Sequence, residues 1–184
     1  MNGSAAWQGI YGAWRLACRD RGAPRYFDGS LAGVLRSFWA GAICYPGFFL
    51  LLWMRPDTPG GGAFLHALII QTIGYVIQWA AYPLAALPFC RWLVPEERAL
   101  GFIAAYNWSQ VLQTAFFVLV ALISLPLPDS GALALGRIGL VAMLGYEWFI
   151  ARVAIGAGGW VAAGMVVLDV VLGSFIVIIT ESLY

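Results

Sequence analysis

The chain has 184 residues, of which 62% are apolar and only 10% are charged, and its formal net charge is +1 at pH 7. An average soluble domain is about 45–50% apolar and about 25% charged, and a soluble fold of this size cannot hide so much apolar surface from water. The composition therefore excludes an ordinary soluble domain and predicts an all-α integral membrane protein. The small net charge gives no indication of a nucleic-acid partner.

Residues 1–30 are predicted to form a cytoplasmic segment with an amphipathic helix in the membrane interface. Apolar and aromatic side chains recur there at helical spacing, at Trp7, Ile10, Tyr11, Trp14 and Cys18. Trp7 and Trp14 are expected to anchor the helix at headgroup depth, and Arg15 and Arg19 to point toward lipid phosphates. Membrane lipid is therefore an expected partner. Asp28 or Ser30 is expected to cap the helix that follows.

Residues 31–184 are predicted to form a single domain of five membrane-spanning helices. The spans are expected at 31–54, 63–93, 99–125, 132–154 and 160–180. Each is long enough to cross a hydrocarbon core that needs about 20 apolar residues. Pro83 and Pro88 are expected to kink the second span, whose freed carbonyl groups neighbouring helices can satisfy.

The arginines predict the orientation of these spans. With the N-terminus in the cytoplasm, that side carries Arg15, Arg19, Arg21, Arg25, Arg36, Arg91, Arg98 and Arg152. The other side carries Arg55 and Arg137. Because short cytoplasmic loops are enriched in basic residues, this asymmetry predicts a cytoplasmic N-terminus and, after five spans, an external C-terminus.

Two acidic residues fall inside predicted spans, where a charge is costly and indicates function by default. Asp169 lies ~14 Å deep at 1.5 Å per residue, on a face of small residues that favours close helix contact. That face comprises Gly158, Ala162, Asp169, Gly173 and Thr180. Glu147 lies ~7–8 Å from the cytoplasmic edge, within reach of Arg152. Each acid either carries a proton or cation, or is a neutral or paired group that joins helices.

Polar side chains also follow one face of the second predicted span and one face of the third. Gln71, Tyr75, Gln78 and Tyr82 share a face of the second span, and Asn107, Gln110 and Thr114, with Gln113 beside them, share a face of the third. These faces either line a polar pathway or form hydrogen bonds between helices. The candidate intramembrane functional residues are therefore Asp169, Glu147, Asn107, Gln110 and Gln78.

Motifs for catalysis or metal binding are not found in the sequence. His66 is the single histidine, and Cys18, Cys44 and Cys90 lack the spacing of metal ligands. The sequence has no nucleophile elbow, phosphate-binding loop or zinc-protease motif. We therefore predict that the protein is not an enzyme and has no metal or cofactor.

The layout resembles the Yip family of small five-span membrane proteins. Pro46 in the first span and Gly74-Tyr75 in the second are features of the kind that this family shows, whereas the acidic Gly-Pro motif of its eukaryotic members is absent. The sequence is also similar to small uncharacterised bacterial inner-membrane proteins, through Phe27-Asp28, Arg36-Ser37-Phe38-Trp39, Pro46 and Ala105-Tyr106-Asn107-Trp108-Ser109. These resemblances imply five spans in a bacterial inner membrane, with a cytoplasmic N-terminus and a periplasmic C-terminus.

Two functions compete on this evidence. The first is a non-enzymatic membrane-organising factor or an accessory subunit, whose partners are other membrane subunits or a second copy of the chain. The alternative is a small transporter or channel that uses Asp169 and Glu147. The five spans do not divide into two equal repeats, as many transporters do.

Overall fold

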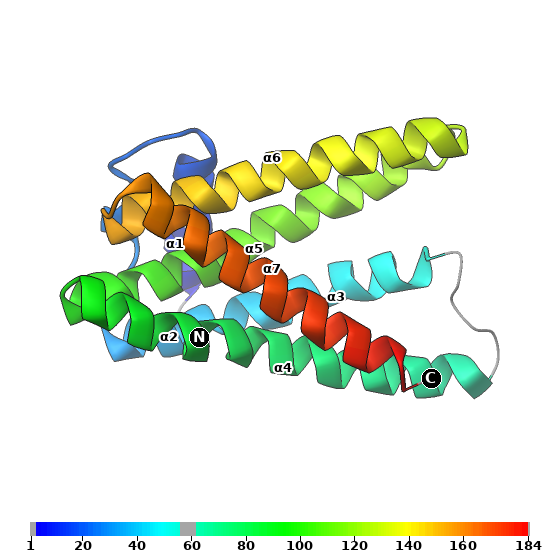
Figure 1. Cartoon of the computed structure of the whole chain (residues 1–184), viewed down its shortest axis with the longest axis horizontal. Helices are drawn as coiled ribbons and strands as arrows, with labels where there is room; N and C mark the ends of the chain where they lie inside the picture. Colours follow the sequence, from blue (N-terminus) through cyan, green and yellow to red (C-terminus); the bar gives the residue numbers. More distant parts are fainter. Residues whose placement is uncertain (1–2, 56–61, 184) are drawn as a thin grey trace.

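A computed structural model describes residues 3–55 and 62–183, and within these ranges the regular structure is helical (Figure 1). Its elements are α1 (Gly3–Ala17), the short 3₁₀ helix η1 (Ala23–Tyr26), α2 (Leu31–Ser37), α3 (Trp39–Trp53), α4 (Gly62–Leu93), α5 (Glu96–Ser124), α6 (Asp129–Ile155) and α7 (Gly159–Glu181). In this part of the chain, five segments are long and apolar enough to cross a membrane, at Leu31–Trp53, Phe64–Leu93, Glu96–Ser124, Asp129–Ile155 and Gly159–Glu181. The prediction of an all-α, multi-pass membrane protein is confirmed.

The first predicted span, 31–54, matches the segment Leu31–Trp53. Within it, α2 and α3 join at Phe38. Ser30 caps α2, because its Oγ accepts a hydrogen bond of 3.0 Å from the Gly33 amide. The Ser37 hydroxyl donates to the Val34 carbonyl at 2.7 Å, and such bonds back to the preceding turn bend helices. Ser37 is fully buried and also accepts a hydrogen bond from Asn107 on α5, so the bend lies where the two spans meet.

The helices pack tightly at one end of the molecule and diverge toward the other. α5 contacts α1, α2, α3, α4 and α6, and the buried core gathers in its first half, around Phe102 and Ile103. A helix that is buried on all sides needs apolar residues on all sides, as Ala99–Ala105 supply. Toward its other end, the α5–α6 hairpin runs away from α3, α4 and α7 (Figure 1).

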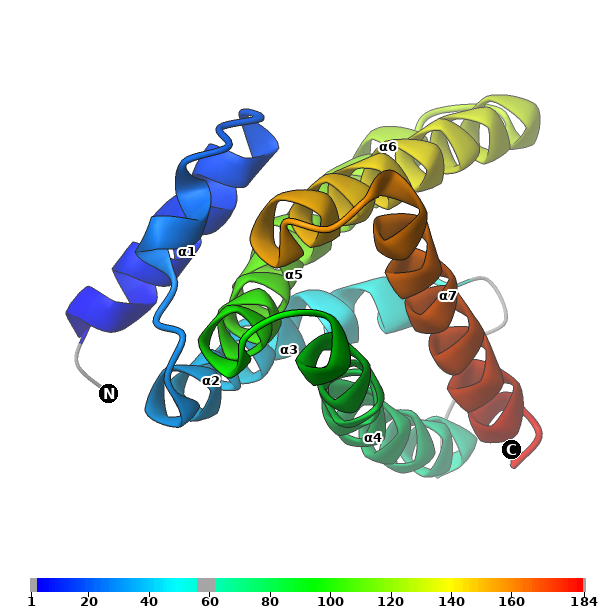
Figure 2. The same ribbon diagram turned by 60° about the vertical axis from the view of Figure 1, so that its left-hand side comes forward.

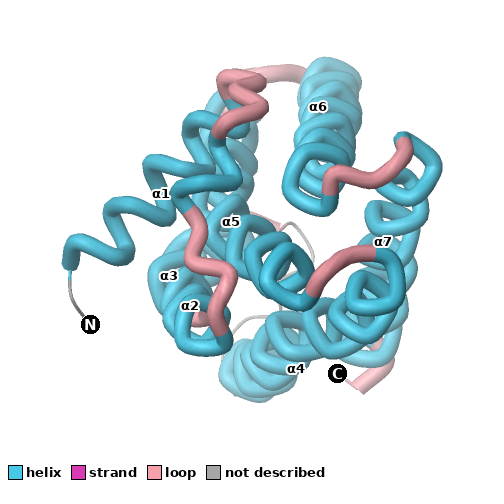
Figure 3. Tube along the Cα trace, turned by 90° about the vertical axis from the view of Figure 1, so that its left-hand side faces the viewer, coloured by secondary structure: helices cyan, strands magenta, loops and turns pink. Residues whose placement is uncertain are grey.

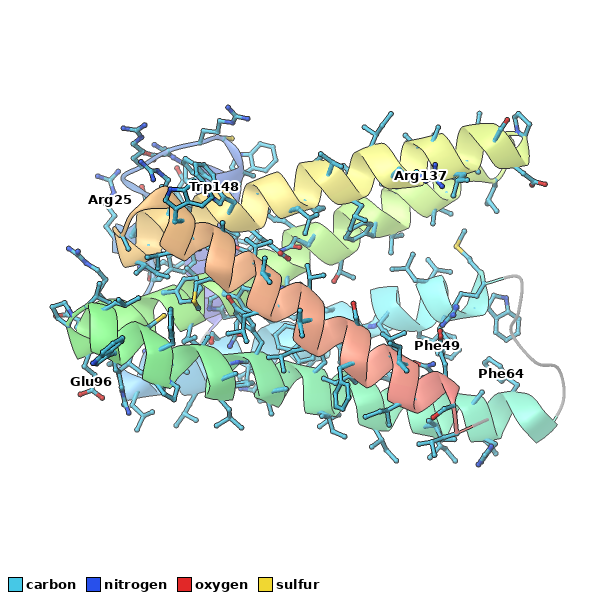
Figure 4. The ribbon with its side chains drawn as sticks, viewed as in Figure 1. Arg25, Phe49, Phe64, Glu96, Arg137 and Trp148 are labelled. Atoms are coloured by element: carbon cyan, nitrogen blue, oxygen red, sulfur yellow. The ribbon has the colours of Figure 1, made fainter. Side chains whose placement is uncertain are left out.

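The two ends of the bundle differ in the number of arginines that they carry. Arg25 and Glu96 lie at the tightly packed end with Trp148, whereas Phe49, Phe64 and Arg137 lie toward the other end (Figure 4). The eight arginines predicted for the cytoplasmic side all belong to segments at the first end, which we call the arginine-rich end. At the opposite end, Arg55 forms an ion pair with Glu181, the last residue of α7.

α1 runs across the bundle rather than along it. In a view along the long axis, α1 extends across the picture while α4, α6 and α7 are seen nearly end-on (Figure 3). Its small residues Ala6, Gly9 and Ala13 are buried, and Tyr146 on α6 donates a hydrogen bond of 2.8 Å to the Ala13 carbonyl. Figure 2 shows the same helix beside α5. This crosswise position fits the predicted interfacial helix, whose depth in a membrane stays a prediction.

Small residues bring α4 and α7 together, as the predicted face of α7 required. A methyl group on Gly74 would collide with the Thr180 side chain, and one on Gly173 would press on Gln78. Ala162 and Thr180 are buried. Gly158 does not belong to this contact, since it is exposed and a side chain there would meet open space; it is the N-cap of α7 and lies in the turn that precedes the packed helix.

The turns follow the predicted signals where they are described. Gly156 ends α6 in the left-handed conformation, with φ of 70°, which a residue without Cβ adopts at little cost. α4 is a continuous helix that includes Pro83 and Pro88. The predicted Pro- and Gly-rich turn of residues 56–61 lies outside the described residues.

Candidate functional site

A cavity of about 280 Å³ lies among the spans and is lined by side chains from α3, α4, α5, α6 and α7. All five candidates predicted inside the membrane line it: Asp169, Glu147, Asn107, Gln110 and Gln78. The helical spacing that selected them identified a face on each helix, and folding turns these faces toward one another. We call this space the polar cavity. It is smaller than the 300–1,000 Å³ typical of pockets for drug-sized ligands, so its size suits a small solute or an ion.

Two carboxyl groups meet in the polar cavity, Glu147 from α6 and Asp169 from α7. They are close enough for one to hydrogen-bond the other when one is protonated. The Tyr106 hydroxyl donates a hydrogen bond of 2.6 Å to Asp169 Oδ1. Two negative charges at this range repel strongly where water is scarce. The pair is therefore stable when it shares a proton or when a cation neutralises it.

Two buried amide side chains, Asn107 and Gln113, lie beside the acids, and the oxygen of the first is not satisfied by the protein. Asn107 is fully buried and donates a hydrogen bond of 2.8 Å to Ser37 Oγ. Within the described chain, its Oδ1 has no hydrogen-bond partner, whereas the amide of Gln113, which is 4% exposed, faces the Glu147 carboxyl group. Buried polar atoms are almost always paired, and an unpaired one calls for an explanation such as a water or an ion. Both residues line the polar cavity.

Aromatic rings form one wall of the cavity. Tyr75 is fixed by a hydrogen bond of 2.7 Å from its hydroxyl to the Gly41 carbonyl. Its ring lies 4.6 Å from that of Phe48 and 6.0 Å from that of Trp79, measured between centroids. Such faces attract cations. The wall therefore places packed aromatic rings beside the two acids.

The polar cavity differs in character along its length. Its polar residues lie near mid-depth, since Asn107 is ~17 Å along α5 at 1.5 Å per residue. Phe117 on α5 and Leu51 on α3 lie further along these helices and line the part nearer the opposite end. On the arginine-rich side, the rings of Tyr82 and Tyr106, whose centroids are 4.1 Å apart, join the buried core around Phe102. The core therefore separates the cavity from that end.

One predicted contact is wrong. As one of two alternatives, the sequence suggested that Glu147 pairs with Arg152, but Glu147 lines the polar cavity. Arg152 instead lies over the Trp148 ring, 5.4 Å from its centroid. Five residues along a helix correspond to a rotation of about 500°, or 140° beyond one full turn, so the two side chains leave the helix on different sides.

Sequence reasoning missed Tyr106 and Trp79 as cavity residues, and treated Cys44 only as an unpaired thiol. Tyr106 directly precedes Asn107, and with Gln110 and Gln113 it follows the same helical spacing, so a search for hydroxyls as well as amides would have found it. Trp79 and Cys44 carried no such signal, because a tryptophan or a cysteine in a span is usually packing. Of the predicted face on α4, Tyr75 and Gln78 line the cavity, while Gln71 and Tyr82 are buried elsewhere.

The predicted interface anchors lie on and just after α1. Trp7 and Trp14 are exposed, at 73% and 56%, as rings that contact lipid would be. Arg15 forms an ion pair of 2.6 Å with Asp20, while Arg19 follows the end of the helix. Hydrogen bonds from the Gly22 amide and from Arg15 hold the pKa of Asp20 below its ordinary value.

No protein-family model matches the chain, and neither does any curated protein or any solved structure. The fold and the cavity define a class nonetheless. This is a multi-pass helical membrane protein whose spans enclose polar groups and a pair of acids.

Proposed function

We propose that this protein is a small membrane transporter or channel for a proton or a monovalent cation, with Glu147 and Asp169 as its binding groups. The observation that carries the proposal is the convergence of polar side chains from five separate spans on one cavity. A charge near mid-bilayer costs roughly 2.5–3.5 kcal/mol on insertion scales. Two acids from different helices that meet at one place are therefore better explained by a bound cation or proton than by helix packing.

The unsatisfied oxygen of Asn107 supports the same function. Side chains that only join two helices satisfy one another in pairs, whereas Asn107 Oδ1 has no partner in the described part of the protein. Asn107 Oδ1 is an acceptor that suits a cation or its hydration water, and the Gln113 amide is a donor beside the Glu147 carboxyl group. The aromatic wall of Tyr75 and Trp79 adds a second attraction for positive charge.

Flux measurements on the purified full chain in lipid vesicles test this proposal. Vesicles that hold a pH-sensitive dye receive an imposed gradient of protons, Na⁺ or K⁺. We expect wild-type protein to dissipate one of these gradients faster than empty vesicles do. Asp169→Asn and Glu147→Gln should slow that flux about tenfold or more, because a hydrogen bond to a charged group contributes about 1.5–3 kcal/mol and about 1.4 kcal/mol is tenfold.

Asp129→Asn is the matched control, because Asp129 is an exposed acid in the first turn of α6 and does not line the polar cavity. Its flux should equal that of wild type. We expect Asp169→Asn to insert and fold, since the amide keeps the shape and removes a costly charge. Wild-type flux equal to that of empty vesicles for all three ions would contradict the proposal, as would full flux in both cavity variants.

The other function predicted from the sequence, a membrane-organising factor or accessory subunit, is tested separately. It predicts that purification in mild detergent yields a stoichiometric complex with other membrane subunits. The resemblance to the Yip family and the bacterial inner-membrane location also stay predictions, as does the absence of enzymatic activity. For orientation we propose that the arginine-rich end faces the cytoplasm, which makes the polar cavity reach toward the external side.

A further inference from the structure

A second cavity, of about 830 Å³, lies between the end of α1 and the α5–α6 hairpin. Among the described residues it shares no lining side chain with the polar cavity. Its walls are apolar, with Leu112 and Phe116 from α5, Val141 and Phe149 from α6, and Trp14 from α1. We call it the lateral groove, because Val141 is 69% exposed and the wall therefore opens to the surroundings of the bundle.

Three arginines line one end of the lateral groove: Arg19 and Arg21 after α1, and Arg152 on α6. Of the five other arginines at this end of the molecule, three form ion pairs, Arg15–Asp20, Arg36–Asp28 and Arg91–Glu96. Within the described residues, the three groove arginines make no ion pair, and no acidic residue lines the groove. Their positive charge is therefore available to an anion from outside the protein.

The backbone holds Arg19 at this place in an unusual way. Arg19 has φ of 59°, in the left-handed region that most residues avoid. It ends α1 in a Schellman arrangement, in which the Asp20 amide bonds the Arg15 carbonyl and the Arg19 amide bonds the Leu16 carbonyl, both at 2.9 Å. Glycine is the usual residue at this position. Arginine does not favour this backbone conformation, but its charge suits the C-terminal end of a helix dipole. The turn fixes the point at which the Arg19 side chain leaves the backbone beside the lateral groove.

We propose that the lateral groove binds an anionic phospholipid, with the phosphate on Arg19, Arg21 and Arg152 and an acyl chain along the apolar wall. The α6 part of the groove runs from Val141 to Val153, which is ~18 Å of helix. That length matches one leaflet, since the whole hydrocarbon core is about 30 Å thick. Arginine suits phosphate because its planar fork donates two parallel hydrogen bonds. The lipid comes from the leaflet at the arginine-rich end.

Lipid binding to the delipidated full chain tests this site, measured by native mass spectrometry and by the rise in the thermal unfolding midpoint. The probes are phosphatidylglycerol and phosphatidylcholine with the same acyl chains. Phosphatidylglycerol should bind more tightly. A basic side chain near a charged headgroup contributes about 1 kcal/mol, so Arg152→Gln should weaken binding about fivefold and the triple change to Gln on the order of 100-fold. Arg25→Gln is the matched control, because Arg25 lies at the same end outside the groove.

Two further variants separate a lipid site from a structural role or a bare phosphate site. Arg19→Gly should keep or raise the unfolding midpoint, because glycine suits the left-handed turn, and should still weaken lipid binding. Gly145 lines the groove and a side chain there meets open space, so Gly145→Leu should fill the groove and weaken lipid binding with all arginines present. Inorganic phosphate alone should not raise the midpoint.

Equal binding of the two lipids would overturn the proposal. So would an Arg152→Gln variant that binds phosphatidylglycerol as wild type does, or a Gly145→Leu variant that keeps full binding. Stabilisation by inorganic phosphate as strong as that by the lipid would show an anion site without an acyl-chain groove.

Discussion

The hydroxyl of Tyr106 connects α5 to the acid of α7. Because this bond to Asp169 is 2.6 Å long and Tyr106 is buried, Tyr106→Phe should remove it while keeping the ring that stacks on Tyr82. We expect the free energy of unfolding to fall by about 1 kcal/mol, near the upper part of the range measured for hydrogen bonds between spans. Ion flux should fall as well, since Asp169 loses the donor that positions it. Thermal unfolding in detergent and vesicle flux check both effects.

Tyr146→Phe is the control for Tyr106→Phe. This variant also removes a hydroxyl, which bonds Ala13 and Ser109 at 2.8 and 3.1 Å. Tyr146 lies outside the polar cavity. Its stability should fall to a similar extent while flux is kept. A Tyr106→Phe protein with wild-type flux would show that Asp169 is positioned without Tyr106.

At the scale of elements, the contact between α4 and α7 depends on the missing side chain of Gly74. Gly74→Ala should lower the free energy of unfolding by about 1–3 kcal/mol, the usual cost of overpacking, because the new methyl group collides with the Thr180 methyl group. Adding Thr180→Ser should restore most of that loss, since serine lacks the methyl group and keeps the hydroxyl that bonds Val177. Thermal unfolding in detergent measures both variants.

Gly136→Ala on α6 is the matched control for the α4–α7 contact, because a side chain there meets open space. It should leave stability unchanged or raise it slightly, as alanine favours helices over glycine. A Gly74→Ala protein as stable as wild type, or no rescue by Thr180→Ser, would contradict the close packing of α4 on α7.

The sequence predicts the spans well and their interruptions poorly. Length and hydropathy suffice for α4 to α7, because a bilayer of fixed thickness demands long apolar helices. The interruption at Phe38 lies beside Ser37, whose hydroxyl bonds the Val34 carbonyl three residues back and also Asn107, 70 positions away. The second of these contacts cannot be read from a local pattern. The cavity shows the same division. Spacing identifies the polar face of each helix, but which faces meet depends on how the helices pack. The pairing of Glu147 with Arg152 was considered because the two residues are close in the sequence, and the packing of α6 on α7 overrides it.

At the scale of the whole molecule, the arginine-rich end is expected to face the cytoplasm. Cys18 gives a native test, because it is the exposed cysteine while Cys44 and Cys90 are buried. A membrane-impermeant maleimide should label Cys18 in inverted vesicles and not in intact cells. A reporter fused after residue 184 should be active only if it works in the external compartment. Labelling in intact cells, or a C-terminal reporter active in the cytoplasm, would contradict the orientation.

The central claim is that Glu147 and Asp169 together bind a proton or a monovalent cation inside the membrane. Infrared difference spectroscopy of the purified protein tests it most directly, because a protonated carboxyl group absorbs separately from a carboxylate. The account predicts a protonated-carboxyl signal in wild type that changes when pH is raised or when Na⁺ or K⁺ is added. The double variant Asp169→Asn with Glu147→Gln should lose this signal, whereas Asp129→Asn should keep it. A wild-type spectrum that matches the double variant at every pH and with every cation would contradict the claim.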